Sequence, residues 1–156
     1  MRHKVIKMRP PRIAIVLLAT CGLLYWLIPS LRTYFWYCPG LGITIFTFGL
    51  GLMMWAWVTF KSLKNPICPT ATAITLIRTG PFRYSRNPMY LGMLIMLISV
   101  FIWTGAPIFI APPVLFFAII QIFFIPFEEA RLADIFKDEY MEYEVATGRW
   151  ICLNKG

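Results

Sequence analysis

The decapeptide RYSRNPMYLG, residues 83–92, carries a polar turn directly into an apolar segment that continues for tens of residues. Asn87 is a favoured residue at the N-cap of a helix, and Pro88 suits the first helical position because proline has no backbone N–H to leave unpaired. The stretch therefore predicts the start of a helix that enters a membrane. The free N–H groups of such a first turn, with Arg83 and Arg86 beside them, favour a bound carboxylate or phosphate, although both arginines are also typical of plain topology charges.

The composition supports the membrane interpretation. Hydrophobic residues make up 59% of the 156-residue chain and charged residues 14%, whereas soluble domains average roughly 45–50% and about 25%. The length suits a single domain, and we expect residues 1–156 to form one integral membrane domain. We expect the apolar run at 13–28 to be retained as a span, because the residues after it, PSLR at 29–32, make a poor signal-peptidase site.

Four apolar segments approach the roughly 20 residues that a helix needs to cross a bilayer. They are residues 13–28, 40–60, 89–105 and 107–127. Pro112 and Pro113 interrupt the last segment. Either this span is kinked there, or residues 105–112 form an interfacial loop and a shorter helix begins at Pro112.

The basic residues indicate the orientation. Fourteen of the fifteen Lys and Arg residues lie in the N-terminal tail, in the loop at 61–88 and in the tail after Phe127, which four spans would place on one side of the bilayer. Basic residues concentrate on the cytoplasmic side. We therefore expect both termini, a cofactor loop at 61–88 and a tail at 128–156 to be cytoplasmic, in a prokaryotic inner membrane because no targeting segment is evident.

The tail has its own periodicity. Charged residues separate a set of apolar residues that recur at three- and four-residue spacing. The apolar residues are Leu132, Ile135, Phe136, Tyr140 and Tyr143. This pattern predicts an amphipathic helix at the cytoplasmic interface, which Gly148 would end. The expected fold class is therefore all-α, an integral membrane bundle of four transmembrane helices with a C-terminal amphipathic interfacial helix.

Several function classes are disfavoured by the distribution of polar residues. The net charge of +8 is spread over loops and tails without a soluble basic face, so nucleic acid is not an expected partner. Four cysteines without a CxxC pair and a single histidine predict no metal site. The sequence from Met89 to Phe127 contains no Asp, Glu, Lys, Arg or His, which disfavours proton-coupled transport. Chemistry is therefore expected at the cytoplasmic face.

Two adjacent acids, Glu128 and Glu129, follow the last apolar segment. Acids in the first turn of an interfacial helix are mildly favourable on their own. Two acids that face a loop of arginines also suit a cationic ligand or an ion pair, and both interpretations stay open at this point.

The ordered motifs resemble one family of membrane enzymes. TGPFRYSRNPMYLG at 79–92, FEEARL at 127–132 and a late Arg-Trp at 149–150 resemble the isoprenylcysteine carboxyl methyltransferase and phospholipid methyltransferase superfamily, over residues 75–151. The resemblance implies S-adenosylmethionine bound at the cytoplasmic face and a lipophilic or lipidated acceptor that arrives from the bilayer. Asn87 stands where the prenylcysteine enzymes usually have His, so no acid–base role is expected of it.

The resemblance also implies roles for individual residues. The expected cofactor-binding residues are Arg86, Asn87, Tyr90, Leu91, Gly92, Glu128 and Glu129. The expected catalytic residues are Arg149, which would orient the acceptor, and Glu128. The expected lining of the acceptor pocket is Tyr140, Tyr143 and Trp150.

The acceptor is left open by these motifs. A prenylcysteine-like carboxylate needs no base but needs Arg149 nearby to orient it. The amine of a phospholipid must lose a proton and therefore needs a glutamate as its base. Two further alternatives are an NADPH-dependent enzyme similar to the sterol reductases, which share an R-H-P-x-Y loop, and a non-catalytic lipid-binding membrane protein.

Overall fold

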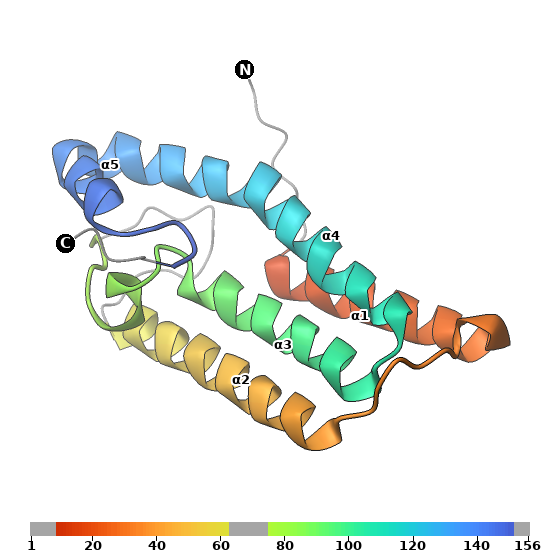
Figure 1. Cartoon of the computed structure of the whole chain (residues 1–156). Helices are drawn as coiled ribbons and strands as arrows, with labels where there is room; N and C mark the ends of the chain where they lie inside the picture. Colours follow the sequence, from red (N-terminus) through yellow and green to blue (C-terminus); the bar gives the residue numbers. More distant parts are fainter. Residues whose placement is uncertain (1–8, 63–74, 152–156) are drawn as a thin grey trace.

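The computed structural model describes residues 9–62 and 75–151, and within them every regular element is a helix (Figure 1). This confirms the all-α class. The five α-helices are α1 (Pro10–Leu27), α2 (Pro39–Ser62), α3 (Pro88–Thr104), α4 (Ala111–Ile119) and α5 (Ile125–Ala146). Three short 3₁₀ turns lie at Pro29–Leu31, Gly80–Arg83 and Pro107–Ile110, and a π-helical turn, Ile120–Phe124, joins α4 to α5.

Three helical stretches of the described chain are long and apolar enough to cross a membrane: Pro10–Leu27, Pro39–Ser62 and the continuous stretch Pro107–Ala146. The remaining expected span, residues 89–105, corresponds to α3, which has 17 residues and is a shorter apolar helix. Its first turn begins at Pro88, as the sequence predicts.

The helices α2 and α3 lie side by side and form the closest helix pair (Figure 1). A Cβ atom added to Gly92 would lie 2.8 Å from the carbonyl oxygen of Gly49 and 2.9 Å from the Cβ of Met53. Near the other end, a Cβ on Gly42 would lie 2.6 Å from that of Trp103. Small residues at such crossings let two membrane helices approach closely.

The two interior prolines of the fourth segment begin a helix and do not kink one. Pro112 and Pro113 lie in the first turn of α4, directly after the 3₁₀ turn Pro107–Ile110. The N–H groups of the first turn have no hydrogen-bond acceptor within the helix, so proline, which lacks an N–H, is tolerated there. Of the two alternatives left open by the sequence, the structure therefore matches the shorter helix, with its start at Ala111.

The helix continues past Pro126, where the sequence predicts a change to a separate interfacial helix. The π-helical turn Ile120–Phe124 precedes this proline, and a π turn accommodates the missing N–H and the bulk of the ring. The break comes later, at Lys137, whose φ of 46° and ψ of −118° are not helical. Figure 1 shows the last turns of α5 folding back beneath the long helix, and the helix ends at Ala146.

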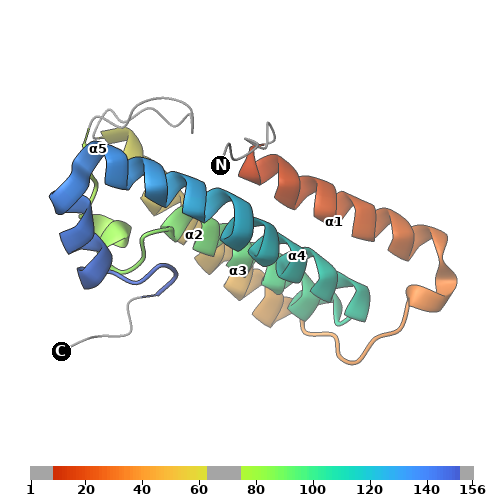
Figure 2. The ribbon, with the colours of Figure 1, turned by 90° about the horizontal axis from the view of Figure 1, so that it is seen from above.

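The core between the helices lies beside the polar loop. Ile13 of α1 packs in one cluster with Tyr90 and Met93 of α3 and Phe116 and Ile120 of the last stretch. Figure 2 shows α1 running beside α4. The start of α1 is thus fixed close to the start of α3.

Candidate functional site

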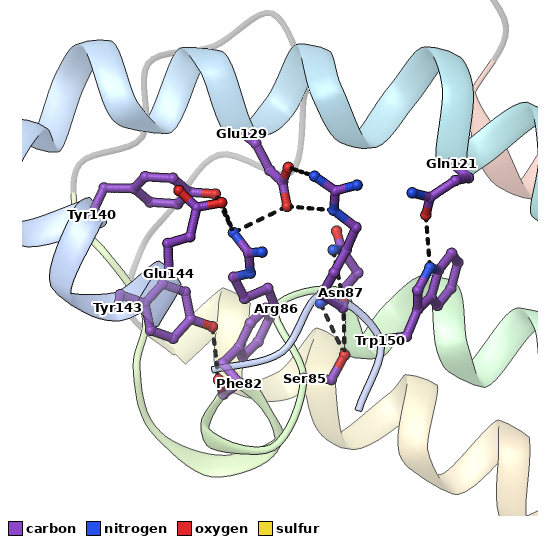
Figure 3. Close-up of polar contacts among 11 residues, drawn as sticks. Phe82, Ser85, Arg86, Asn87, Gln121, Glu129, Tyr140, Tyr143, Glu144 and Trp150 are labelled. Atoms are coloured by element: carbon purple, nitrogen blue, oxygen red, sulfur yellow. Dashed lines mark hydrogen bonds and ion pairs between the residues drawn. The ribbon is translucent and has the colours of Figure 1, made fainter. Parts of the chain in front are cut away.

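Three separate segments converge at the polar end of the bundle. They are the turn that leads into α3, the part of α5 after Phe127, and the tail segment at 147–150 (Figure 3). Figure 3 shows Glu129 above Arg86 and Asn87, with Tyr140 and Glu144 on one side and Trp150 on the other. The structure therefore brings together the two motifs that the sequence places about 40 residues apart.

Glu129 forms ion pairs with two arginines. Arg149 donates two hydrogen bonds to it, with Nε at 3.1 Å from Oε1 and Nη2 at 2.6 Å from Oε2. Nη1 of Arg86 lies 3.2 Å from Oε1 of the same carboxylate. The side chains of Glu129 and Arg86 are 13% and 10% exposed, so each buried charge is compensated by the other.

Arg86 has two more partners on α5. Its Nη1 donates to Oε1 of Glu144 at 2.7 Å and to the hydroxyl of Tyr140 at 3.1 Å. Its Nε is buried and has no hydrogen-bond partner within the described part of the chain. Arg86 thus joins the α3 loop to the folded-back end of α5, whereas Arg83 lies exposed on the preceding turn.

Asn87 occupies the N-cap position of α3, but its side chain does not cap the helix. Its Nδ2 donates to the carbonyl of Arg149 at 3.0 Å, and the backbone N–H of Arg86 donates to the carbonyl of Gly148 at 3.0 Å. The hydroxyl of Ser85 accepts the backbone N–H of Asn87 at 3.0 Å. The polar turn therefore binds the tail segment, a role that helix-capping patterns do not predict.

Glu128 has a different environment from Glu129. It is the first charged residue after the apolar run, which ends at Phe127. The hydroxyl of Tyr90 donates to its Oε1 at 2.7 Å. Burial raises the pKa of Glu128 to about 7, the hydrogen bond from Tyr90 lowers it, and the negative charge of Glu129 raises it. Glu128 can therefore exchange a proton near neutral pH.

The aromatic residues of the tail take separate places. Tyr143 donates from its hydroxyl to the carbonyl of Phe82 at 2.7 Å. Trp150 donates from its indole N–H to Oε1 of Gln121 at 2.8 Å, and its ring lies 5.0 Å from that of Phe117. Trp150 thus anchors the tail on α4 and the π-helical turn.

A cavity of about 840 Å³ lies among these elements. Seven of the expected site residues line it: Arg86, Asn87, Tyr90, Glu128, Glu129, Tyr140 and Tyr143. Four others are outside its lining: Leu91, Gly92, Arg149 and Trp150. Gly92 lies at the crossing with α2, and Arg149 contacts two residues of the lining, Glu129 through its side chain and Asn87 through its carbonyl. Apolar side chains of α2 and α3, among them Met53, Trp57 and Met93, form the other part of the wall.

Sequence reasoning missed several contributors to this site. Ser85 and Glu144 lie within the motif region but carry no distinctive pattern. Gln121 did have a signal, because it is the single polar residue in the apolar run at 107–127. Arg9, at the start of α1, also lines the cavity, and its distance in sequence from both motifs gave no indication of this.

Comparison with known proteins identifies one family. A family model described as phospholipid methyltransferase matches residues 37–139. The matched region contains Arg86, Asn87, Tyr90, Glu128 and Glu129, whereas α1 and the tail segment lie outside it. No curated protein and no solved structure gives a significant match to the chain.

Proposed function

The chain belongs to the phospholipid methyltransferase family, and on this premise we propose that it transfers a methyl group from S-adenosylmethionine to a lipid-borne acceptor at the cytoplasmic face of the membrane. The observation that supports this best is the cavity itself. It combines a polar part, built from the paired motifs, with an apolar part built from α2 and α3.

The cavity suits the cofactor in size and in charge. Its volume of about 840 Å³ falls within the roughly 300–1,000 Å³ of small-molecule sites. Glu128 offers a partly buried carboxylate to a cationic sulfonium, since its hydrogen bond comes from a neutral tyrosine. We propose that Arg86, Asn87, Tyr90, Glu128 and Glu129 bind the cofactor.

The protein contributes mainly alignment. S-adenosylmethionine, when bound, supplies the electrophilic methyl group. The residues of this chain would position the acceptor beside the bound cofactor and exclude water, and such alignment can lower a barrier by about 7–11 kcal/mol. The tail segment supports this role, because Arg149 and Asn87 hold it across the polar turn.

The geometry favours an amine over a carboxylate as the acceptor. Arg149, the residue expected to orient a carboxylate acceptor, is engaged by both oxygens of Glu129. An amine must lose a proton before it attacks, and Glu128 lies in the cavity with a pKa near neutrality. We therefore propose Glu128 as the base that takes the proton from a phospholipid amine.

We also propose the membrane arrangement that the charge pattern favours. In this arrangement the helix α3 also crosses the membrane and brings the number of spans to four, since its 17 residues lie within the roughly 17–25 that suffice for a crossing. The whole chain forms one domain with both termini in the cytoplasm of a prokaryotic cell, because the basic residues flank the polar ends of the helices.

Calorimetric titration of the detergent-purified protein tests the cofactor assignment. We expect saturable binding of S-adenosylhomocysteine and no binding of NADPH. Glu128→Gln and Asp134→Asn, on the same helix, each remove one negative charge. In a titration with S-adenosylmethionine, whose sulfonium is cationic, only Glu128→Gln should weaken binding, because Asp134 is exposed and outside the cavity lining. Binding of NADPH would assign the protein to the reductases, and binding of neither ligand by folded protein would favour a non-catalytic lipid-binding protein.

Transfer of a labelled methyl group tests the acceptor. We expect incorporation into phosphatidylethanolamine and none into a farnesylated cysteine analogue. The reverse result would reject the amine and return Arg149 to the role of orienting a carboxylate.

A further inference from the structure

The start of α1 forms part of the cavity wall although it lies outside the family match. Arg9, Pro10 and Pro11 line the cavity that also contains Glu128, whereas the matched region begins at residue 37. Ile13, one turn further on, is 7% exposed and packs in the same cluster as Tyr90. The first turn of α1 is therefore held beside the catalytic half of the site and is not a remote topology signal.

Arg9 differs in its ion pairing from the other arginines around the cavity. Arg86 is compensated by Glu129 and Glu144, and Glu129 also pairs with Arg149. Arg131, the third arginine of the lining, has interactions of its own. Among the described residues Arg9 forms no ion pair with any carboxylate, and its side chain is exposed.

The donor at this position is the Arg9 side chain and not the end of the helix. Pro10 and Pro11 have no backbone N–H, and the N–H groups of Arg12 and Ile13 both donate to the carbonyl of Arg9. The first turn therefore offers no free N–H to an anion. A guanidinium presents two parallel donors, which match the oxygens of a phosphate.

We propose that Arg9 binds the phosphate of the phospholipid acceptor and thereby selects amines that carry a phosphate. This rests on the proposed function. Glu128 and Arg9 belong to the same cavity and have opposite charges, as do the amine and the phosphate of a zwitterionic headgroup. The apolar wall from Met53 and Met54 lies in the same cavity and suits the lipid part of the molecule.

The test compares two lipid amines in mixed micelles, phosphatidylethanolamine and the phosphate-free oleylamine. For Arg9→Gln we expect the KM for phosphatidylethanolamine to rise about tenfold, the scale of one charge-assisted hydrogen-bonded contact. The KM for oleylamine should stay unchanged, and Arg9→Lys should recover part of the loss. Arg12→Gln is the matched control, because Arg12 is exposed on the same turn and outside the cavity lining.

The outcomes separate this inference from the function on which it rests. If the wild type methylates neither amine, the proposed function fails first. If it methylates them and Arg9→Gln changes both KM values equally, or neither, then Arg9 does not recognise the phosphate. Inhibition by inorganic phosphate is the second arm: if Arg9→Gln abolishes this inhibition but leaves the KM for phosphatidylethanolamine intact, the position binds free phosphate and the proposal for the acceptor is overturned.

Discussion

Arg149 fixes Glu129 by two parallel hydrogen bonds, one from Nε at 3.1 Å and one from Nη2 at 2.6 Å. The pair joins the tail to α5 across the polar turn, where the backbone carbonyl of Arg149 also accepts a hydrogen bond from Asn87. The two acids of the FEEARL motif thus have different roles. Glu129 organises the charges around the cavity, and Glu128 is left with a neutral partner.

Replacement of Glu129 should destabilise the fold. Glu129→Gln would leave Arg86, which is 10% exposed, without one of its carboxylates. Removal of one partner from a buried ion pair costs about 3–5 kcal/mol. Because Arg149 is 36% exposed, solvent screening should bring the cost below this range, to about 2–3 kcal/mol. Thermal unfolding in detergent measures the change.

The control for this prediction is Glu139→Gln. Glu139 is 55% exposed and pairs with Arg78 at 3.5 Å, and exposed pairs contribute about 0–1 kcal/mol. Equal losses for both variants would mean that the Glu129 network has no special structural role.

The pH dependence of methyl transfer should follow Glu128. The pKa of Glu128 is raised by burial to about 7, so activity should increase as pH rises through 7 and the base loses its proton. The hydroxyl of Tyr90 favours the ionised carboxylate. Tyr90→Phe should therefore move the rising limb to higher pH by about 1–2 pH units, the scale of one hydrogen bond to a charge. An unmoved limb would exclude Glu128 as the titrating base.

The pH dependence of the stability gives an independent check, because stability should fall over the pH range in which activity rises. The folded pKa of Glu128 lies above its unfolded value of 4.5, so its contribution to stability is fully present below pH 4.5 and is lost as pH rises to about 7. We expect Glu128→Gln to remove this loss between pH 4.5 and about pH 7, as measured by thermal unfolding.

The convergence of the two motifs was predictable because each motif specifies residue types in order, and both belong to the polar ends of adjacent spans. The ion pairs that Glu129 forms with Arg86 and Arg149 could not be predicted from the sequence. Which arginine meets Glu129 depends on the turn at Lys137, and the sequence around Lys137 is that of an uninterrupted amphipathic helix. Trp150 could be assigned to the acceptor pocket only by resemblance, since its partner Gln121 lies 29 residues away. Arg9 reaches the cavity through the packing of Ile13, which no local pattern encodes.

Gly92 should matter for helix packing and not for cofactor contact. A Cβ at this position would lie 2.8 Å from the carbonyl oxygen of Gly49, and overpacking of this kind costs typically about 1–3 kcal/mol. We expect Gly92→Ala to lower the unfolding temperature. Gly51→Ala is the control, because a Cβ at Gly51 meets nothing within 4 Å. Normal stability with lost S-adenosylhomocysteine binding would return Gly92 to the cofactor site.

The orientation can be tested with the exposed thiol of Cys38. Cys38 lies in the loop between α1 and α2, at the end of the bundle away from the polar turn. In cells that express a variant with Cys68 and Cys152 replaced by serine, a membrane-impermeant maleimide should label Cys38 from outside. Cys21 is buried and should stay unlabelled. A further variant with Cys38→Ser, in which Cys21 is the remaining thiol, should therefore show no labelling. Labelling only after lysis would invert the proposed topology.

Trp150 should act on the site through the position of the tail. Trp150→Phe keeps an aromatic ring against Phe117 but loses the hydrogen bond to Gln121. A hydrogen bond contributes about 1 kcal/mol net, so we expect S-adenosylhomocysteine to bind several-fold more weakly while the KM for the lipid acceptor stays unchanged. Gln121→Leu should reproduce the effect, and the double variant should be no worse than either single one, because both remove the same bond. Trp26→Phe, at a position that is 69% exposed, controls for the loss of an indole. A raised KM with unchanged cofactor affinity would instead put Trp150 in the acceptor pocket, as the resemblance alone implies.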